Sequence, residues 1–137
     1  AVLASARATH TRLGGPGRWT LLLPASYVAG VQVICRSLVA GHQPVLLEEH
    51  ASFAESVEAM GEPSPVEPVE SPARFVSLVP TQLHRMLDAP ADAAALRTFH
   101  TVLLGGGPID PSLRAREPWS HPAVGAAAPT RCAPRAR

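Results

Sequence analysis

Three consecutive glycines follow a short apolar run in the second half of the chain. The apolar run covers residues 101–104, and Gly105, Gly106, Gly107 and Pro108 come directly after it. Because glycine has no β-carbon, a strand that ends in such residues can bring bare backbone close to a flat or anionic ligand. These four residues are therefore candidates for a ligand-binding turn. The alternative is a tight connection between a strand and a helix that binds nothing.

Two other apolar runs, residues 19–23 and 75–79, each stop at a proline. Side chains with hydroxyl groups lie near these places: Ser26, Tyr27 and Thr81 follow the prolines, and Ser77 lies within the second run. The hydroxyl group of Tyr27 can line a ring pocket or donate a hydrogen bond to a carboxylate. The structural alternatives are that Tyr27 is only the half-buried first residue of a helix, and that Thr81 is a helix N-cap.

Strands that alternate with helices are expected to position these residues. The predicted strands are 19–23, 44–47, 75–79 and 101–104, and the predicted helices are 1–13, 28–40, 53–60, 81–87 and 91–97, with another from Pro111. We expect helix 28–40 to be largely buried. The strands are continuous apolar runs, which is typical of a parallel sheet covered on both faces. The fold class is therefore α/β, built of parallel-sheet βα units, and ligands are expected beyond the carboxyl ends of the strands.

Composition excludes several classes of function. The 137 residues carry a formal net charge of +1, which gives no electrostatic case for binding nucleic acid. No run of eighteen apolar residues or signal peptide is found, so no membrane partner is expected. The six histidines lack metal-ligand spacing, so we predict no metal site within the chain. Cys35 falls in an apolar helical pattern, and we expect a buried free thiol, as in a reducing compartment.

Three segments together resemble one enzyme family. RWTLLLPASYVAGVQVICRSLVAG, RFVSLVPTQLHRML and FHTVLLGGGPIDPSL are similar, in order and spacing, to the central part of the adenylate-forming acyl-CoA ligases. Within that superfamily they look most like the o-succinylbenzoate–CoA ligases of menaquinone biosynthesis. The resemblance covers residues 1 to about 116. It implies that this region is part of the large N-terminal domain of an adenylate-forming enzyme.

The resemblance also implies a reaction and its reactants. In this family an acid carboxylate attacks the α-phosphate of ATP, with Mg²⁺ present, and coenzyme A thiol then displaces AMP from the acyl-adenylate. The expected partners are thus a small-molecule acid, ATP and coenzyme A, in the cytoplasm; the oligomeric state is left open. Gly105, Gly106, Gly107 and Pro108 match the glycine motif along the adenylate. Tyr27 stands where the family commonly has histidine, or Ser26 does if the register slips by one residue. Ser77 and Thr81 match a segment that borders the acyl pocket.

Several family elements have no counterpart in the chain. The phosphate loop with its lysine, the acid that helps to hold Mg²⁺, and the catalytic C-terminal lysine are all missing, and the chain has no lysine at all. We therefore assign no catalytic residue, expect the chain to be an internal fragment, and predict that it is inactive and poorly stable alone. The alternatives are a non-catalytic α/β nucleotide-binding module and a protein-interaction domain that uses the proline-rich residues 61–72.

The last part of the chain has a different character. Residues 117–137 show no periodicity and are rich in Ala, Pro and Arg, which GC-rich codons encode. We expect two units, the ligase-like residues 1–116 and an irregular tail from residue 117. The tail is either an out-of-frame translation or a native irregular segment, and the sequence leaves both open. It also leaves open which acid the enzyme activates.

Overall fold

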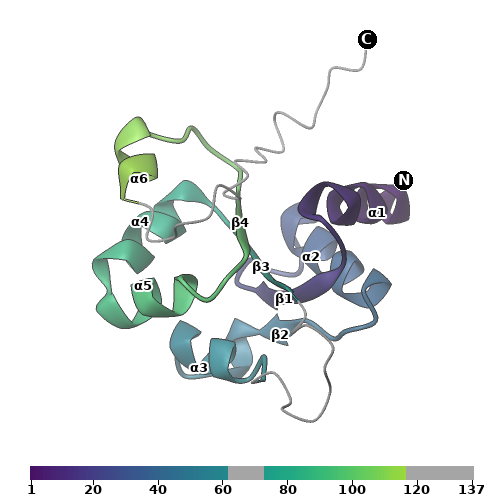
Figure 1. Cartoon of the computed structure of the whole chain (residues 1–137), viewed down its shortest axis with the longest axis horizontal. Helices are drawn as coiled ribbons and strands as arrows, with labels where there is room; N and C mark the ends of the chain where they lie inside the picture. Colours follow the sequence, from purple (N-terminus) through teal and green to yellow (C-terminus); the bar gives the residue numbers. More distant parts are fainter. Residues whose placement is uncertain (62–72, 117–137) are drawn as a thin grey trace.

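The computed structural model describes residues 1–61 and 73–116 (Figure 1). Its strands are β1 (Gly17–Leu21), β2 (Val45–Leu46), β3 (Ala73–Leu78) and β4 (Thr101–Leu104). Its helices are α1 (Val2–Leu13), α2 (Val28–Val39), α3 (Phe53–Glu58), α4 (Pro80–Asp88), α5 (Pro90–Leu96) and α6 (Pro111–Ala115), with one 3₁₀ turn, η1 (Leu47–Glu49). The expected loop in residues 61–72, apart from Gly61, and the expected tail from residue 117 lie outside the described residues.

The strands form one parallel sheet in the order β2-β1-β3-β4. Trp19 of β1 lies opposite Phe75 of β3, and Val76 of β3 lies opposite Val102 of β4. A parallel pair needs a crossover connection, which the helices between the strands provide. The predicted α/β class with a parallel sheet is confirmed.

Helices cover both faces of the sheet (Figure 1). On one face, α1 and α2 enclose a cluster that includes Trp19, Phe75 and Leu103. On the other face, α3, α4 and α5 enclose a larger cluster that includes Leu78 and Leu104. Successive residues of a strand point to opposite faces, so a sheet that is buried on both sides needs apolar residues at nearly every position. This is why the strands are continuous apolar runs in the sequence.

Helix α2 departs from the expected burial. Only Gly30, Val33 and Ser37 of this helix are buried. The side chains of Val28 and Leu38 are 78% and 61% exposed, so the expectation of a largely buried helix is wrong. Apolar periodicity showed that α2 is apolar on more than one face, but not which of those faces this chain covers.

Two further features bear on the predictions. Cys35 is a free thiol, but it is half-buried and not fully buried as expected. Cys132 lies outside the described residues. No helix within residues 1–61 and 73–116 combines the length and the apolar character needed to cross a membrane.

Candidate functional site

The glycine turn after β4 lies against the start of α4. The backbone N–H of Gly105 donates a hydrogen bond of 3.1 Å to the carbonyl oxygen of Leu78, which extends the pairing of β4 with β3 beyond the last strand residues. A β-carbon on Gly106 would stand 3.2 Å from Cγ1 of Val79, and one on Gly107 would stand 3.9 Å from the ring of Pro80. The structure therefore brings together the glycine turn and the end of β3, as the topology predicted.

The turn presents backbone to solvent. Gly106, Gly107 and Pro108 are exposed, and Gly105 is half-buried. Gly106 has φ of +80°, a left-handed conformation that side chains other than glycine seldom adopt. Its conformation turns the chain away from the sheet immediately after the strand. Glycine at position 106 thus allows the left-handed backbone conformation, and glycine at position 107 leaves the backbone uncovered by a side chain.

Asp110 ends the turn and starts α6. Its Oδ1 atom accepts a hydrogen bond of 2.7 Å from the backbone N–H of Ser112, and its carbonyl oxygen accepts one from the N–H of Leu113. This is an N-cap arrangement, with Pro111 at the first helical position. The hydrogen bonds from Ser112 lower the pKa of the Asp110 carboxyl group. Asp110 therefore has a structural role that the sequence analysis did not assign.

A tight connection at the end of β1 presents Tyr27. The backbone N–H of Tyr27 donates a hydrogen bond of 3.0 Å to the carbonyl oxygen of Pro24. Tyr27 is the N-cap residue of α2, and its side chain is 65% exposed, whereas the structural alternative expected it to be half-buried. Ser26 is exposed beside it. Both candidates at this strand end are thus accessible to a ligand.

The remaining two candidates have different environments. Ser77 is a half-buried residue of β3, paired opposite Leu103. Thr81 is exposed and lies inside α4, because the helix begins one residue earlier, at Pro80. The prediction that Thr81 is the N-cap is therefore wrong. Pro80 occupies the first helical position, where its missing N–H costs nothing.

Gln82 provides the cap of α4. Its Oε1 atom accepts a hydrogen bond of 3.0 Å from the N–H of Val79, the residue before the helix. Its Nε2 atom donates a longer bond of 3.4 Å to the carbonyl oxygen of Leu22. One side chain therefore ties the end of β1 to the start of α4. Sequence reasoning missed this residue, although a glutamine three positions after an N-cap is the recognised capping-box position.

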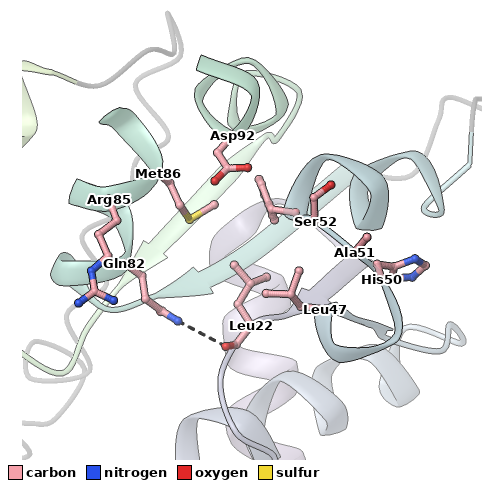
Figure 2. Close-up of a pocket in the computed structure, with 10 residues that line it drawn as sticks. Leu22, Leu47, His50, Ala51, Ser52, Gln82, Arg85, Met86 and Asp92 are labelled. Carbon is pink, nitrogen blue, oxygen red and sulfur yellow. Dashed lines mark hydrogen bonds between the residues drawn. The ribbon is translucent and has the colours of Figure 1, made fainter. Parts of the chain in front are cut away.

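A pocket of about 320 Å³ lies beside Gln82, between the ends of β1 and β2 and the helices α3, α4 and α5 (Figure 2). It is lined by Leu22, Leu47, His50, Ala51, Ser52, Phe53, Gln82, Arg85, Met86 and Asp92. The guanidinium of Arg85 and the ring of His50 point away from the hollow in Figure 2. None of the residues predicted from the sequence lines this pocket.

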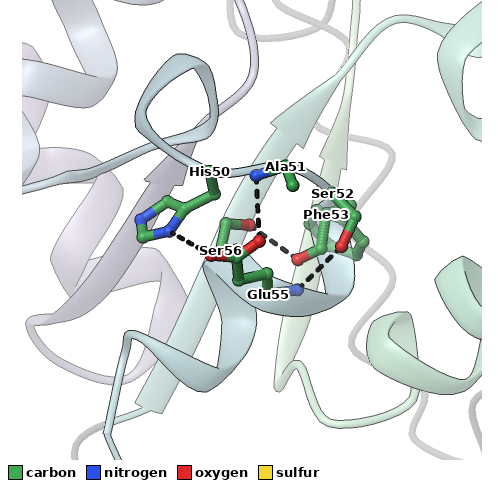
Figure 3. Close-up of polar contacts among 6 residues, drawn as sticks. All are labelled: His50, Ala51, Ser52, Phe53, Glu55 and Ser56. Atoms are coloured by element: carbon green, nitrogen blue, oxygen red, sulfur yellow. Dashed lines mark hydrogen bonds and ion pairs between the residues drawn. The ribbon is translucent and has the colours of Figure 1, made fainter.

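The polar groups at the rim of the pocket serve to start α3 (Figure 3). The Oγ atom of Ser52 accepts a hydrogen bond of 3.1 Å from the N–H of Glu55, and Oε2 of Glu55 accepts one of 2.9 Å from the N–H of Ala51. The pattern resembles a capping box, except that the carboxylate of Glu55 accepts from Ala51, the residue before the N-cap Ser52. The Nδ1 atom of His50 lies 3.8 Å from Oε1 of Glu55, which is within ion-pair distance. The serine oxygen accepts from backbone, so the arrangement is structural and does not activate a nucleophile.

The described residues leave open backbone at the glycine turn and form no metal-binding cluster. The surface at Gly107 is open, because a β-carbon there would make only ordinary contact, at 3.9 Å, with the ring of Pro80. In residues 1–61 and 73–116, no group of three or more histidine, cysteine, aspartate or glutamate side chains could hold a metal ion.

Comparisons with known proteins show which proteins the chain resembles. No family model matches the chain. It is 44% identical over 108 residues to a probable 2-succinylbenzoate–CoA ligase of Mycobacterium tuberculosis, which covers 79% of the chain and 27% of the relative. It is 28% identical over 116 residues to the 2-succinylbenzoate–CoA ligase of Enterococcus faecalis, over 83% of the chain and 22% of the relative. The chain therefore spans about a quarter of the length of these relatives.

A solved structure shows the same relationship. The crystal structure of an acyl-CoA synthetase (AMP-forming)/AMP-acid ligase II-like protein from Dyadobacter fermentans matches with a TM-score of 0.60 and 26% identity. The match covers 84% of this chain and 30% of the synthetase. In sequence and in fold, the chain is therefore similar to the AMP-forming acyl-CoA synthetases, and it aligns with a segment of the 2-succinylbenzoate–CoA ligases.

Proposed function

We propose that this chain forms part of the adenylate- and acyl-binding wall of an ATP-dependent acid–CoA ligase whose acid is o-succinylbenzoate. The observation that carries the proposal is the exposed glycine turn, held beside the start of α4 by the hydrogen bond from Gly105 to Leu78. The similarity to the 2-succinylbenzoate–CoA ligases supports the choice of acid. The proposal places the enzyme in menaquinone biosynthesis and in the cytoplasm, where ATP and coenzyme A are available.

Each candidate residue has a proposed role in binding. The backbone of Gly105, Gly106, Gly107 and Pro108 lies along the adenine and the acyl group of the adenylate. Tyr27 and Ser26, which are both exposed at the end of β1, contact the acid. Ser77 and Thr81 border the acyl pocket from β3 and α4. In this scheme the acid carboxylate attacks the α-phosphate of ATP, pyrophosphate leaves, and coenzyme A thiol displaces AMP.

Stabilisation of the phosphate charge must come from other parts of the ligase. Developing charge on a transferred phosphoryl group needs cations at fixed positions. The chain contains no lysine, and the described residues form no metal-binding cluster. We therefore expect the isolated chain to release no pyrophosphate from ATP, even with the acid present.

A chimeric enzyme tests the proposal. The 108 matched residues of the Mycobacterium tuberculosis ligase are replaced by those of this chain, and pyrophosphate release is measured with ATP, Mg²⁺ and o-succinylbenzoate. We expect turnover that depends on o-succinylbenzoate, with benzoate and a straight-chain fatty acid as control acids. Thioester formation after addition of coenzyme A would complete the reaction. A chimera that folds cooperatively but does not form the adenylate would overturn the proposal.

A further inference from the structure

A side chain just after α6 ties this helix to α4, which lies beside it in Figure 1. The Nη2 atom of Arg116 lies 2.5 Å from Oδ1 of Asp88, and its Nη1 atom lies 2.9 Å from Nδ1 of His84. His84 and Asp88 are four residues apart on α4, so they lie on the same face of that helix, one turn apart. One guanidinium group thus spans two partners on a neighbouring helix. We call this arrangement the Arg116 fork.

The two contacts of the fork have defined donors and acceptors. Arginine has no acceptor atom, so Arg116 donates both hydrogen bonds. The Nδ1 atom of His84 must therefore carry a lone pair, which requires a neutral ring with its proton on Nε2. The hydrogen bond and the charge of Arg116 lower the pKa of Asp88, so the carboxylate is ionised at neutral pH. A planar guanidinium matches such a fixed pair of partners better than a flexible ammonium group does.

Helix α6 depends on such contacts because it is short. It has five residues, and an isolated helix of that length is not stable in water. Its start is held by the cap from Asp110, and its middle is held by Leu113, whose side chain is buried in the larger core cluster. The fork attaches Arg116, the residue that directly follows the helix. Loss of the fork therefore leaves the end of α6 without this attachment to α4.

We propose that Arg116 is a positioning residue of the ligase: the fork fixes α6 against α4, and α6 fixes the glycine turn that precedes it. The inference rests on the proposed function, because it takes the turn as part of the binding wall. One end of the turn, residues 105–110, is fixed to β3 by the hydrogen bond from Gly105 to Leu78, and the other end continues into α6. Because α4 begins beside the turn, at Pro80, the fork ties both ends of the turn to β3 and α4.

The exposure of the fork limits its expected effect. The side chains of Arg116 and Asp88 are 39% and 63% exposed, and exposed ion pairs contribute little to global stability. Such a pair changes a local equilibrium by about two- to fivefold. We therefore expect the loss of the fork to act on local opening of the turn and of α6, and to leave the melting temperature of the whole protein nearly unchanged.

Hydrogen exchange of the chimera, followed by mass spectrometry, tests the local effect. The replaced segment is carried to Arg116 for this purpose. Arg116→Gln removes the fork, and Arg116→Lys keeps the charge but has a single ammonium group that cannot span both partners. We expect both substitutions to speed amide exchange in residues 106–113 about two- to fivefold, and to leave residues 101–105 unchanged. Arg85→Gln, at an exposed position on α4, is the control and should change neither segment.

Steady-state kinetics of the same variants test the positioning role. KM for ATP and for o-succinylbenzoate should rise about two- to fivefold in Arg116→Gln and Arg116→Lys, because a looser turn lowers the fraction of enzyme that is ready to bind. The value of kcat should stay unchanged, since the fork does not touch the reacting atoms. In the Asp88→Ala background, Arg116→Gln should have a smaller effect on exchange and on KM than it has in the parent, because the two residues act together.

Other outcomes would overturn the inference. Unchanged exchange in Arg116→Gln would show that the fork does not support the turn, and additive effects of Arg116→Gln and Asp88→Ala would show that the two residues do not act together. Faster exchange with unaltered KM in an active chimera would remove Arg116 from the positioning of the site. A parent chimera that forms no adenylate would count against the proposed function alone, because the exchange measurement needs no turnover and still decides whether the fork holds the turn.

Discussion

Gly30 lies directly against the carbonyl group of Pro24: a β-carbon on Gly30 would stand 2.2 Å from that oxygen and 2.8 Å from the carbonyl carbon. The same oxygen accepts the hydrogen bond from the N–H of Tyr27. The Pro-x-x-Tyr-x-x-Gly sequence is thus one packed unit, in which the proline and the glycine hold the tyrosine at the N-terminus of α2. The glycine belongs to the scaffold, and the side chain of the tyrosine is left exposed.

Replacement of Gly30 should therefore destabilise the fold. We expect Gly30→Ala to lower the free energy of unfolding by about 1–3 kcal/mol, since the new methyl group must displace backbone and not a flexible side chain. Guanidinium denaturation of the ligase chimera measures the change. Gly107→Ala is the matched control, with its β-carbon in ordinary contact at 3.9 Å, and should change stability by less than about 0.5 kcal/mol. Equal effects of the two substitutions would contradict the packing argument.

Substitutions at Gly106 and Gly107 should distinguish an effect of backbone strain on stability from an effect of ligand contact on kinetics. Because Gly106 has φ of +80°, Gly106→Ala is expected to cost about 1–2 kcal/mol of stability, and Gly106→Asn should cost less since asparagine tolerates this region. Gly107→Val should instead leave the melting temperature nearly unchanged and raise KM for ATP and for the acid. Calorimetry and steady-state kinetics of the chimera measure both. A Gly107→Val enzyme with unaltered kinetics would remove Gly107 from the proposed site.

The arrangement of the sheet was predictable because its determinants are local. Residues 101–104 form a continuous apolar run, and the structure buries all four of them. Helix boundaries were harder, as Thr81 shows. A hydroxyl next to a proline resembles a cap, but Pro80 is itself the first residue of the helix, and the side chain of Gln82 accepts the bond from Val79. The start of the helix could have been predicted from the position of Gln82, three residues after Val79, but not from the hydroxyl group of Thr81.

The candidate site was only partly predictable. That the glycine turn meets the end of β3 follows from parallel strand order, which places neighbouring carboxyl ends together. The pocket in Figure 2 could not be found in this way, because Leu22, Leu47 and Met86 are ordinary apolar residues from three separate elements. The exposed face of α2 was missed for a related reason. Val28 and Leu38 have the pattern of buried residues, and burial depends on what packs against them.

Gln82 should stabilise the chain through its acceptor atom. Gln82→Ala leaves the N–H of Val79 without its side-chain partner and should lower the free energy of unfolding by about 1 kcal/mol, the usual value for a helix cap. Gln82→Glu keeps the acceptor and loses only the long bond to Leu22, so it should cost less. Thr81→Ala, next to it and exposed, should have little effect. A larger loss from Thr81→Ala than from Gln82→Ala would restore the threonine as the cap.

His10 should make stability depend on pH. It is 7% exposed in α1, its Nε2 atom has no hydrogen-bond partner in the described part of the chain, and burial together with the nearby Arg36 lowers its pKa from 6.5. The unfolded chain then binds a proton more readily than the folded one. The contribution of His10 is therefore fully present above pH 6.5 and is lost as pH falls from that value toward the lower pKa of the folded state.

Urea denaturation of the chimera between pH 7.5 and pH 5, a range of about 1 unit above and 1.5 units below the ordinary histidine pKa, measures this dependence. His10→Gln cannot be protonated, so it should flatten the loss of stability at the acidic end. A parent whose stability rises as the pH falls would show that protonated His10 is favoured in the folded state. Such a preference would need a hydrogen-bond acceptor for the protonated His10 ring. The structure instead has the positively charged guanidinium of Arg36 near this ring.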